Sequence, residues 1–151
     1  MKEKTPPTIL VVDDEDNMRH MLQTLLSESG YAVDTAPDGE KALERVAQAH
    51  YPFVFCDIRM PNMDGMAFLQ AAQSYLENTN VIMMSAYGSI DTAVEAMKNG
   101  AYDYISKPFK PDEILLALKK AEERERLKSE NLELREQIEA IERQALFGEM
   151  I

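Results

Sequence analysis

The chain has 151 residues, of which 45% are hydrophobic, and its formal net charge is −11. This length suits one compact domain plus an appendage, and no apolar run approaches the roughly 20 residues that cross a bilayer. Because DNA binding depends on Lys and Arg side chains that neutralise phosphates, we do not expect direct contact with nucleic acid. One cysteine cannot form an internal disulfide, and the polar N-terminal segment is unlike a secretory signal, so we expect a cytoplasmic protein.

Short apolar segments alternate with amphipathic ones five times along the chain. The apolar segments predict strands at residues 8–12, 31–35, 52–56, 81–84 and 102–105, because each is brief and rich in β-branched, aromatic or other apolar residues. Most of them lack the alternation of a half-exposed strand. That pattern is typical of strands that are buried on both faces of a parallel sheet.

Apolar residues recur at helical spacing between the strands. Gly30 and Gly100 are expected to end the first and fourth of these helices. The apolar faces expected to point inward are Met18, Met21, Leu22, Leu25 and Leu26; Ala42, Leu43, Val46 and Ala47; Phe68, Leu69 and Ala72; Ile90, Ala93, Val94 and Met97; and Ile114, Leu115, Leu118 and Ala121.

Alternating strands and helices require right-handed crossovers and a sheet that is covered on both faces. We therefore predict a flavodoxin-like, doubly wound α/β fold, with a five-stranded parallel sheet in the order 2-1-3-4-5 and five helices. Ligands of such folds bind beyond the carboxyl ends of the strands. The polar residues expected at those ends are Asp13, Asp14, Asp57, Ser85 and Lys107.

These residue types suit phosphoryl chemistry with a hard cation. Clustered carboxylates from Asp13, Asp14 and Asp57 would repel each other unless a cation such as Mg2+ neutralised them. The Asp57 carboxylate can act as a nucleophile, while Lys107 and the Ser85 hydroxyl can bind phosphoryl oxygens. Each residue has a simpler alternative: the first two aspartates could cap a helix, Lys107 could be a surface lysine, and Ser85 could be a loop residue. Taken together, these five residues favour a site for phosphoryl chemistry over the simpler alternatives.

Four stretches resemble bacterial receiver domains of two-component systems, and the resemblance covers roughly residues 6–125. They are Asp13-Asp14 after the first strand, residues 56–65, residues 85–88 and residues 104–109. The resemblance implies that a partner histidine kinase phosphorylates Asp57. It also implies that the chain is not an enzyme acting on other substrates, since its chemistry is Mg-dependent self-phosphorylation and dephosphorylation at that residue.

The same resemblance implies individual roles. Mg2+ would be held by Asp14, Asp57 and the backbone carbonyl of Arg59, with Asp13 supporting it through water. Lys107 would bind the phosphoryl group, and the Lys107–Pro108 peptide is typically cis in such domains. Ser85 and Tyr104 would form the switch pair: phosphorylation draws the serine hydroxyl inward and the tyrosine rotates into the vacated space. The alternative for Tyr104 is a core aromatic with one rotamer.

Two other functions fit parts of the pattern. A phosphatase of the haloacid-dehalogenase type also uses an aspartyl phosphate, Mg2+, serine and lysine. Its acid/base aspartate follows the nucleophile by two positions, where this chain has Arg59, which cannot do that work. A nucleotide- or flavin-binding module would need a glycine-rich first turn. Here that turn is acidic, Asp13-Asp14-Glu15-Asp16, and would repel phosphates.

The last helix is expected to continue beyond the domain, because no helix breaker occurs between Pro111 and Gly148. A heptad pattern from about residue 124 predicts a parallel coiled coil with Asn131 at an a position. A solvated charged helix with incidental leucines is the alternative. The predicted seam contains Leu127, Asn131, Leu134, Ile138, Ile141 and Ala145, flanked by the charge pairs Glu123–Lys128 and Glu130–Arg135.

We therefore predict a receiver domain over residues 1–125, a helical coiled-coil linker over residues 126–147, and the start of an output domain at residues 148–151. A receiver followed by a helical linker resembles sigma-54-dependent transcriptional activators of the nitrogen-regulation type, whose next module is an ATPase. This resemblance places the output ATPase and the DNA-binding domain outside this chain. The heptad pattern predicts a homodimer joined through the linker helix.

Overall fold

The structure, a computed structural model, describes residues 7–86 and 88–149, the last three by their backbone alone. A short 3-10 helix, Gln73–Tyr75, follows the third helix. The other elements alternate as expected: β1 (Thr8–Val12), α1 (Asp16–Glu28), β2 (Ala32–Ala36), α2 (Gly39–Gln48), β3 (Phe53–Asp57), α3 (Gly65–Ala71), β4 (Asn80–Ser85), α4 (Ile90–Lys98), β5 (Asp103–Ser106) and α5 (Pro111–Glu149).

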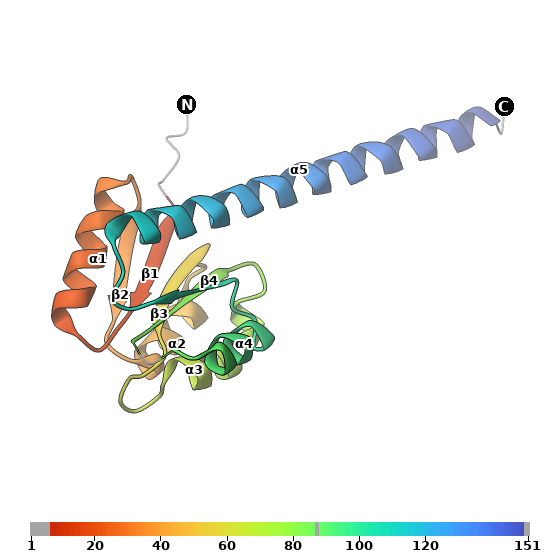
Figure 1. Cartoon of the computed structure of the whole chain (residues 1–151). Coiled ribbons are helices and arrows are strands. Elements are labelled where there is room, and N and C mark those ends of the chain that lie inside the picture. The colour runs from red at the N-terminus through yellow and green to blue at the C-terminus, as the bar shows by residue number, and fades with distance from the viewer. Residues whose placement is uncertain (1–6, 87, 150–151) are drawn as a thin grey trace. The chain divides into compact units, whose positions relative to one another are not determined.

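The five strands form one parallel sheet in the order β2-β1-β3-β4-β5, which confirms the predicted fold. Figure 1 shows α1 and the first turns of α5 on one face of the sheet, and α2, α3 and α4 on the other. The strand order reverses between β1 and β3. In a doubly wound sheet, ligands bind in the crevice at such a reversal. The residues that follow β1 and those that end β3 are therefore well placed to contact a ligand.

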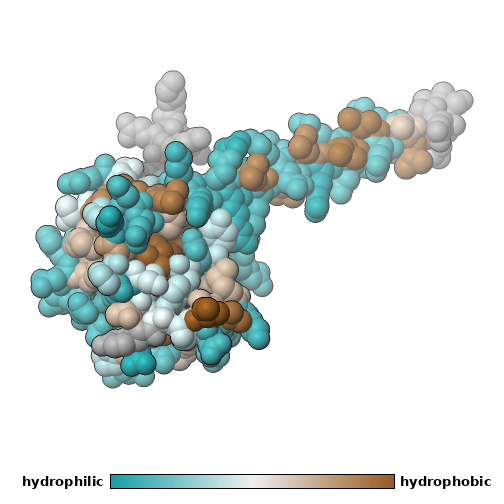
Figure 2. All heavy atoms as spheres, in the orientation of Figure 1, coloured by the Kyte–Doolittle hydropathy of each residue, from teal (hydrophilic) through white to brown (hydrophobic). Residues whose placement is uncertain are grey.

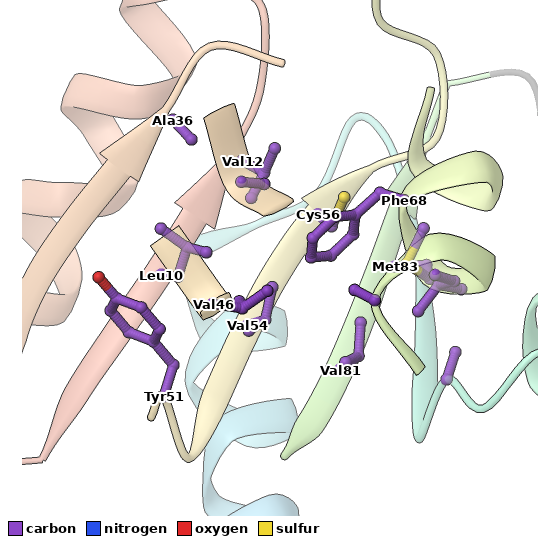
Figure 3. Packing of buried hydrophobic residues seen from close by; sticks show 14 of the residues in the cluster. Leu10, Val12, Ala36, Val46, Tyr51, Val54, Cys56, Phe68, Val81 and Met83 are labelled. Atoms are coloured by element: carbon purple, nitrogen blue, oxygen red, sulfur yellow. The ribbon is translucent and has the colours of Figure 1, made fainter. Parts of the chain in front are cut away.

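Both faces of the sheet bury apolar side chains, because successive residues of a strand point to opposite sides. One set forms a cluster with Val46 of α2 and Phe68 of α3 (Figure 3). Its strand members are Leu10, Val12, Ala36, Val54, Cys56, Val81 and Met83. The intervening residues of the same strands are also buried: Ile9, Val11, Phe55, Ile82 and Met84. The lone cysteine, Cys56, is therefore a core residue, and burial raises its thiol pKa well above the usual value.

Three helices expose apolar residues that the sequence pattern placed inward. In α4, Ile90, Val94 and Met97 are 83%, 46% and 48% exposed, while the small Ala96 is fully buried. Met21 of α1 and Ala47 of α2 are exposed as well. Helical spacing identifies an apolar stripe on a helix. It does not reveal that α4 can lie closer to the sheet on the side of the small Ala96 than on the side of its larger apolar residues. Figure 2 shows the resulting apolar patch in the region of α4.

The last helix, α5, is continuous over 39 residues. The chain divides into two compact units, Met1–Leu118 and Lys119–Ile151. In the second unit the large apolar residues of the predicted seam, Leu127, Leu134, Ile138 and Ile141, are more than half exposed. Figure 2 shows apolar side chains among polar ones along this helix. The predicted output-domain start at 148–151 falls partly outside the described residues. Within the described part of the chain, no helix has the length and apolar character needed to span a membrane.

Candidate functional site

The residues predicted from the sequence lie at adjacent strand ends. Asp13 and Asp14 follow β1, Asp57 is the last residue of β3, Ser85 is the last residue of β4, and Lys107 follows β5. The strand β3 pairs with both β1 and β4, and β4 pairs with β5. The parallel sheet therefore gathers at one edge residues that are as many as 94 positions apart in the sequence.

The three aspartates form one acidic cluster. Asp13, Asp14 and Asp57 each offer a carboxylate oxygen, and these atoms lie within 4.8 Å of one another. The Nζ atom of Lys107 lies 2.7 Å from Asp13 Oδ2 and 3.4 Å from Asp57 Oδ2. Asp13 and Asp57 are buried, whereas Asp14 is exposed. One lysine offsets at most one of three negative charges, so the cluster has a negative balance that a cation would stabilise.

Asp13 is the most completely bonded member of the cluster. Its Oδ1 accepts a hydrogen bond from the backbone N–H of Glu15 at 3.0 Å, and its Oδ2 accepts one from the Lys107 ammonium. Its carbonyl accepts one from the Arg19 guanidinium at 2.7 Å. The N-cap position of α1 is occupied by Glu15 without a side-chain cap. Neither Asp13 nor Asp14 is the N-cap residue, which argues against the simple capping alternative.

Burial and charge together perturb the titration of this cluster. Burial raises the pKa of Asp57 to about 6, and the nearby Asp13 carboxylate adds to the rise while Lys107 opposes it. For Lys107, burial alone would lower the pKa, but the hydrogen bond and charge of Asp13, with a contribution from Asp57, raise it above the usual value. A carboxylate that is costly to ionise beside a lysine that stays charged is typical of functional sites.

A pocket opens at this edge of the sheet. It contains the predicted residues Asp14, Asp57, Arg59, Ser85 and Lys107, and it is completed by Glu15 and Ala86. Glu15 and Ala86 were not among the predicted site residues. Their positions next to Asp14 and Ser85 were the available signal, because residues that follow a parallel strand share its ligand-binding edge. The Lys107–Pro108 peptide is cis, as the resemblance implied.

The expected switch pair has one unusual feature. Ser85 is buried and lines the pocket, whereas Tyr104 is half-buried on β5. The Tyr104 hydroxyl oxygen is buried and has no hydrogen-bond partner among the described residues. It lies against Gly88, where a Cβ atom would overlap the hydroxyl and would lie 2.5 Å from Cζ of the ring. The absence of a side chain at residue 88 therefore makes room for the tyrosine in this position.

The donor set fits a hard divalent cation. Carboxylate oxygens in small number suit Mg2+, which prefers oxygen ligands and retains several waters. The open pocket beside the exposed Asp14 would admit such waters, and Asp57 shares its one lysine partner with Asp13. The cluster of Asp13, Asp14 and Asp57 could therefore hold a metal ion.

Comparisons with known proteins agree with this geometry. The model of the response regulator receiver domain matches residues 9–119. Regulatory protein AtoC of Escherichia coli (strain K12) is 44% identical over 122 residues, which are 81% of this chain and 26% of that protein. Transcriptional regulatory protein ZraR of Klebsiella oxytoca is 45% identical over 113 residues, which are 75% of this chain and 26% of that protein.

Solved structures show the same fold. The receiver domain of NtrX from Brucella abortus superposes with a TM-score of 0.70 at 39% identity, covering 75% of this chain and 96% of that one. The present chain spans about a quarter of the length of the two regulatory relatives above. By its fold, its strand-end residues and the family match over most of its length, the chain belongs to the response regulator receiver domains of two-component systems.

Proposed function

We propose that this receiver is a phosphoryl-accepting switch in which Asp57 takes the phosphoryl group from a partner histidine kinase. The observation that carries the proposal is the placement of a buried, incompletely compensated carboxylate at a strand end, 3.4 Å from a lysine ammonium and beside two further aspartates. In phosphoryl transfer the protein mainly positions groups and neutralises charge, and these residues provide both functions.

In the proposed reaction, a carboxylate oxygen of Asp57 attacks the phosphorus of a phosphohistidine. A P–O bond forms, the P–N bond breaks, and the electron pair stays on the imidazole, which then takes a proton. The Lys107 ammonium binds one phosphoryl oxygen, and the Ser85 hydroxyl donates a hydrogen bond to another. The product is an acyl phosphate.

The proposed metal is Mg2+, held by Asp14, Asp57 and the backbone carbonyl of Arg59, with Asp13 acting through water. When bound, it would offset the charge of the carboxylates and of the phosphoryl oxygens. The contacts of Asp13 support a less direct role for this residue, because both of its carboxylate oxygens already accept hydrogen bonds within the chain. Asp14 is exposed to the pocket and has the freer side chain.

We further propose that the phosphoryl group acts on Ser85 and Tyr104 as the switch pair. The serine lines the phosphoryl pocket, and the tyrosine hydroxyl is buried without a partner among the described residues. A buried, unsatisfied hydroxyl costs free energy, so the present tyrosine position is held weakly. Movement of Ser85 toward a phosphoryl oxygen would therefore shift the balance between two tyrosine positions.

Phosphorylation with a small donor would test the acceptor. The chain is incubated with acetyl phosphate and Mg2+, and the modified residue is mapped by mass spectrometry. We expect Asp57→Asn to abolish labelling, whereas Asp91→Asn, which removes an exposed carboxylate of α4, should label as the wild type does. Equal labelling of the wild type and Asp57→Asn would show that the acceptor is elsewhere.

The second unit supports a proposal about assembly. We propose a homodimer formed by a parallel coiled coil in the linker, residues 126–147, with its predicted seam beginning near residue 124. In the described chain, Leu127, Leu134, Ile138 and Ile141 are exposed, as a seam without its partner would be. Within one helix, Arg126 pairs with both Glu123 and Glu130, so the predicted interhelical charge pairs would have to compete with it.

The relatives support a proposal about output. One is named a regulatory protein and the other a transcriptional regulatory protein. We propose that this receiver controls a transcription-activating output of the sigma-54-dependent type, with an ATPase and a DNA-binding domain encoded beyond this chain, in the cytoplasm. The acidic charge of the present residues makes them a poor surface for DNA.

A further inference from the structure

The loop that follows the proposed phosphoacceptor, residues 58–64, is attached to the first turn of α2. The Asn62 side-chain amide donates a hydrogen bond to Asp38 Oδ2 at 3.1 Å, and the Gly39 N–H donates to the Met63 carbonyl at 3.0 Å. A Cβ atom at Gly39 would lie 2.5 Å from that carbonyl oxygen and 2.8 Å from Met63 Cγ. Glycine is therefore needed for the helix terminus to approach the loop this closely.

The backbone at the tip of this loop is in an uncommon conformation. Asn62 has a φ of 68°, and it is the one non-glycine residue with a positive φ in the described ranges. Asparagine tolerates the left-handed region better than most residues. Such positions persist where the surrounding contacts determine the backbone, and they cluster at functional sites. Here the determining contact comes from Asp38.

Asp38 uses its two carboxylate oxygens for two different contacts. Its Oδ1 accepts the Lys41 N–H at 2.9 Å, which caps α2, while its Oδ2 accepts the Asn62 amide. The Lys41 N–H is the main reason that the pKa of Asp38 lies below its usual value, and the Asn62 amide contributes in the same direction. The helix cap and the loop attachment therefore depend on one side chain, yet they can be separated by mutation.

The two ends of the loop are held by backbone hydrogen bonds, one to β4 and one between the ends themselves. The Ile58 N–H donates to the Met84 carbonyl at 2.9 Å, and the Gly65 N–H donates to the Ile58 carbonyl at 2.7 Å. The attachment to α2 fixes the tip, and Arg59 lies between these anchors and lines the pocket. A backbone segment held at both ends and at its tip has little conformational entropy left to lose when it binds a ligand.

We infer that Asp38 and Asn62 are positioning residues for the metal site: they hold the loop so that the Arg59 backbone is already placed before a cation binds. This inference rests on the proposed function, because the Arg59 carbonyl is a proposed ligand. Groups that orient the ligands of a metal without touching it commonly change affinity by about 10- to 100-fold when removed. For one exposed hydrogen bond we expect an effect at the lower end, roughly 10-fold.

The variants separate the attachment from the cap. Asp38→Ser retains an N-cap side chain but is too short to reach Asn62, and Asn62→Gly retains the positive φ but has no amide. Asp38→Asn is the rescue variant, because its oxygen can cap the helix while its amide donates to the Asn62 oxygen in the flipped orientation. Tyr51→Phe is the matched control: it removes the 2.6 Å hydrogen bond to Asp34 at the amino end of β3, away from the pocket.

Two readouts are measured on the 151-residue chain: the Mg2+ dissociation constant by titration calorimetry, and the acetyl phosphate reaction rate against Mg2+ concentration. We expect Asp38→Ser and Asn62→Gly to weaken Mg2+ binding by roughly 10-fold, with the rate at saturating Mg2+ close to that of the wild type. Asp38→Asn and Tyr51→Phe should bind Mg2+ as the wild type does.

Two outcomes would overturn the inference. Unchanged Mg2+ affinity in both loop variants would show that the attachment does not position a ligand. A loss of affinity that merely follows thermal stability, with Tyr51→Phe affected to the same degree, would show a general structural role. If the wild type itself bound no Mg2+, the proposed metal site would fail and the inference with it, a result that is distinguishable because it appears before any substitution is made.

Discussion

Lys107 lies closer to Asp13 than to Asp57: its Nζ atom is 2.7 Å from an oxygen of the former and 3.4 Å from an oxygen of the latter. The lysine of this site is therefore bonded chiefly to an aspartate that is not the proposed phosphoacceptor. Both carboxylates are buried, so one ammonium group compensates two charges that water cannot reach freely. A phosphoryl group on Asp57 would compete with Asp13 for this lysine.

Removal of this lysine should destabilise the fold. Lys107→Met leaves two buried carboxylates without their cation, and breaking a buried pair from one side typically costs about 3 kcal/mol. We expect a loss of that order in the free energy of unfolding, measured by urea denaturation in metal-free buffer. Lys110→Met, at a neighbouring exposed position, should change it little. Similar stabilities of the two variants would mean that the Asp13–Lys107 contact contributes nothing to folding.

Neutralising the phosphoacceptor should have the opposite effect. Asp57 is harder to ionise than a free aspartate because of burial and the charge of Asp13, so Asp57→Asn removes an unfavourable charge at neutral pH. We expect the metal-free variant to be more stable than the wild type, on the order of 1 kcal/mol. Mg2+ should raise the unfolding temperature of the wild type and have a much smaller effect on the variant. Calorimetric scans with and without Mg2+ would show both effects, and a destabilised Asp57→Asn would contradict the charge argument.

Two tyrosine-to-phenylalanine substitutions should differ in their effect on stability. The Tyr51 hydroxyl donates a 2.6 Å hydrogen bond to Asp34, so Tyr51→Phe should lose about 1–2 kcal/mol. The buried Tyr104 hydroxyl has no partner among the described residues, so Tyr104→Phe should be neutral or stabilising. Urea denaturation of the two variants gives the comparison. Equal losses in the free energy of unfolding would indicate that the Tyr104 hydroxyl is hydrogen-bonded in solution.

Tyr51 should also titrate late. Burial, aided by the hydrogen bond to Asp34, raises its pKa from 10.0 to about 12. Because the pKa is higher in the folded state, the associated stability is fully present below about pH 10 and is lost as the pH rises through about 12. Ultraviolet absorbance should show tyrosinate forming at about pH 12 in the wild type, and Tyr51→Phe should lack that late step. Retention of the late step in the variant would assign it to another residue.

The dimer proposal predicts a position-dependent effect in the linker. Leu134 and Leu132 are similarly exposed in one chain, at 57% and 60%, but only Leu134 belongs to the predicted seam. Leu134→Asp should convert a dimer to monomers in sedimentation equilibrium at high micromolar concentration, whereas Leu132→Asp should not. A dimer that survives Leu134→Asp would be held by the receiver itself, and a monomeric wild type would exclude the proposed coiled coil.

The strand ends of the site were predictable because the geometry of a parallel sheet is repetitive. Once Asp57 and Lys107 are assigned to the ends of their strands, the sheet alone brings them to one edge. The fold was predictable for the same reason, since short buried strands alternating with helices allow few topologies.

Contacts within that edge were not predictable, because they depend on side-chain reach and loop shape. Nothing in the spacing of Asp13 and Lys107 indicates that their contact is shorter than the one between Lys107 and Asp57. The hydrogen bond between Asp38 and Asn62 occurs where the asparagine backbone is left-handed. The sequence alone does not determine this backbone conformation. The α4 helix shows a further limit: its apolar stripe was visible in the pattern, yet Ala96 and not Ile90 is buried, because a pattern does not specify how closely a helix approaches its sheet.

The position of Cys56 gives this chain an internal reporter. It is the single cysteine in the sequence, it is fully buried, and it directly precedes the proposed phosphoacceptor on β3. A thiol-specific reagent can reach it only when the strand becomes accessible through local or global opening. The rate of thiol labelling in native conditions therefore measures the opening of the central strand, without any engineered probe. A ligand that binds at Asp57 and stabilises the closed strand should slow this labelling by the same factor by which it lowers the population of the open strand.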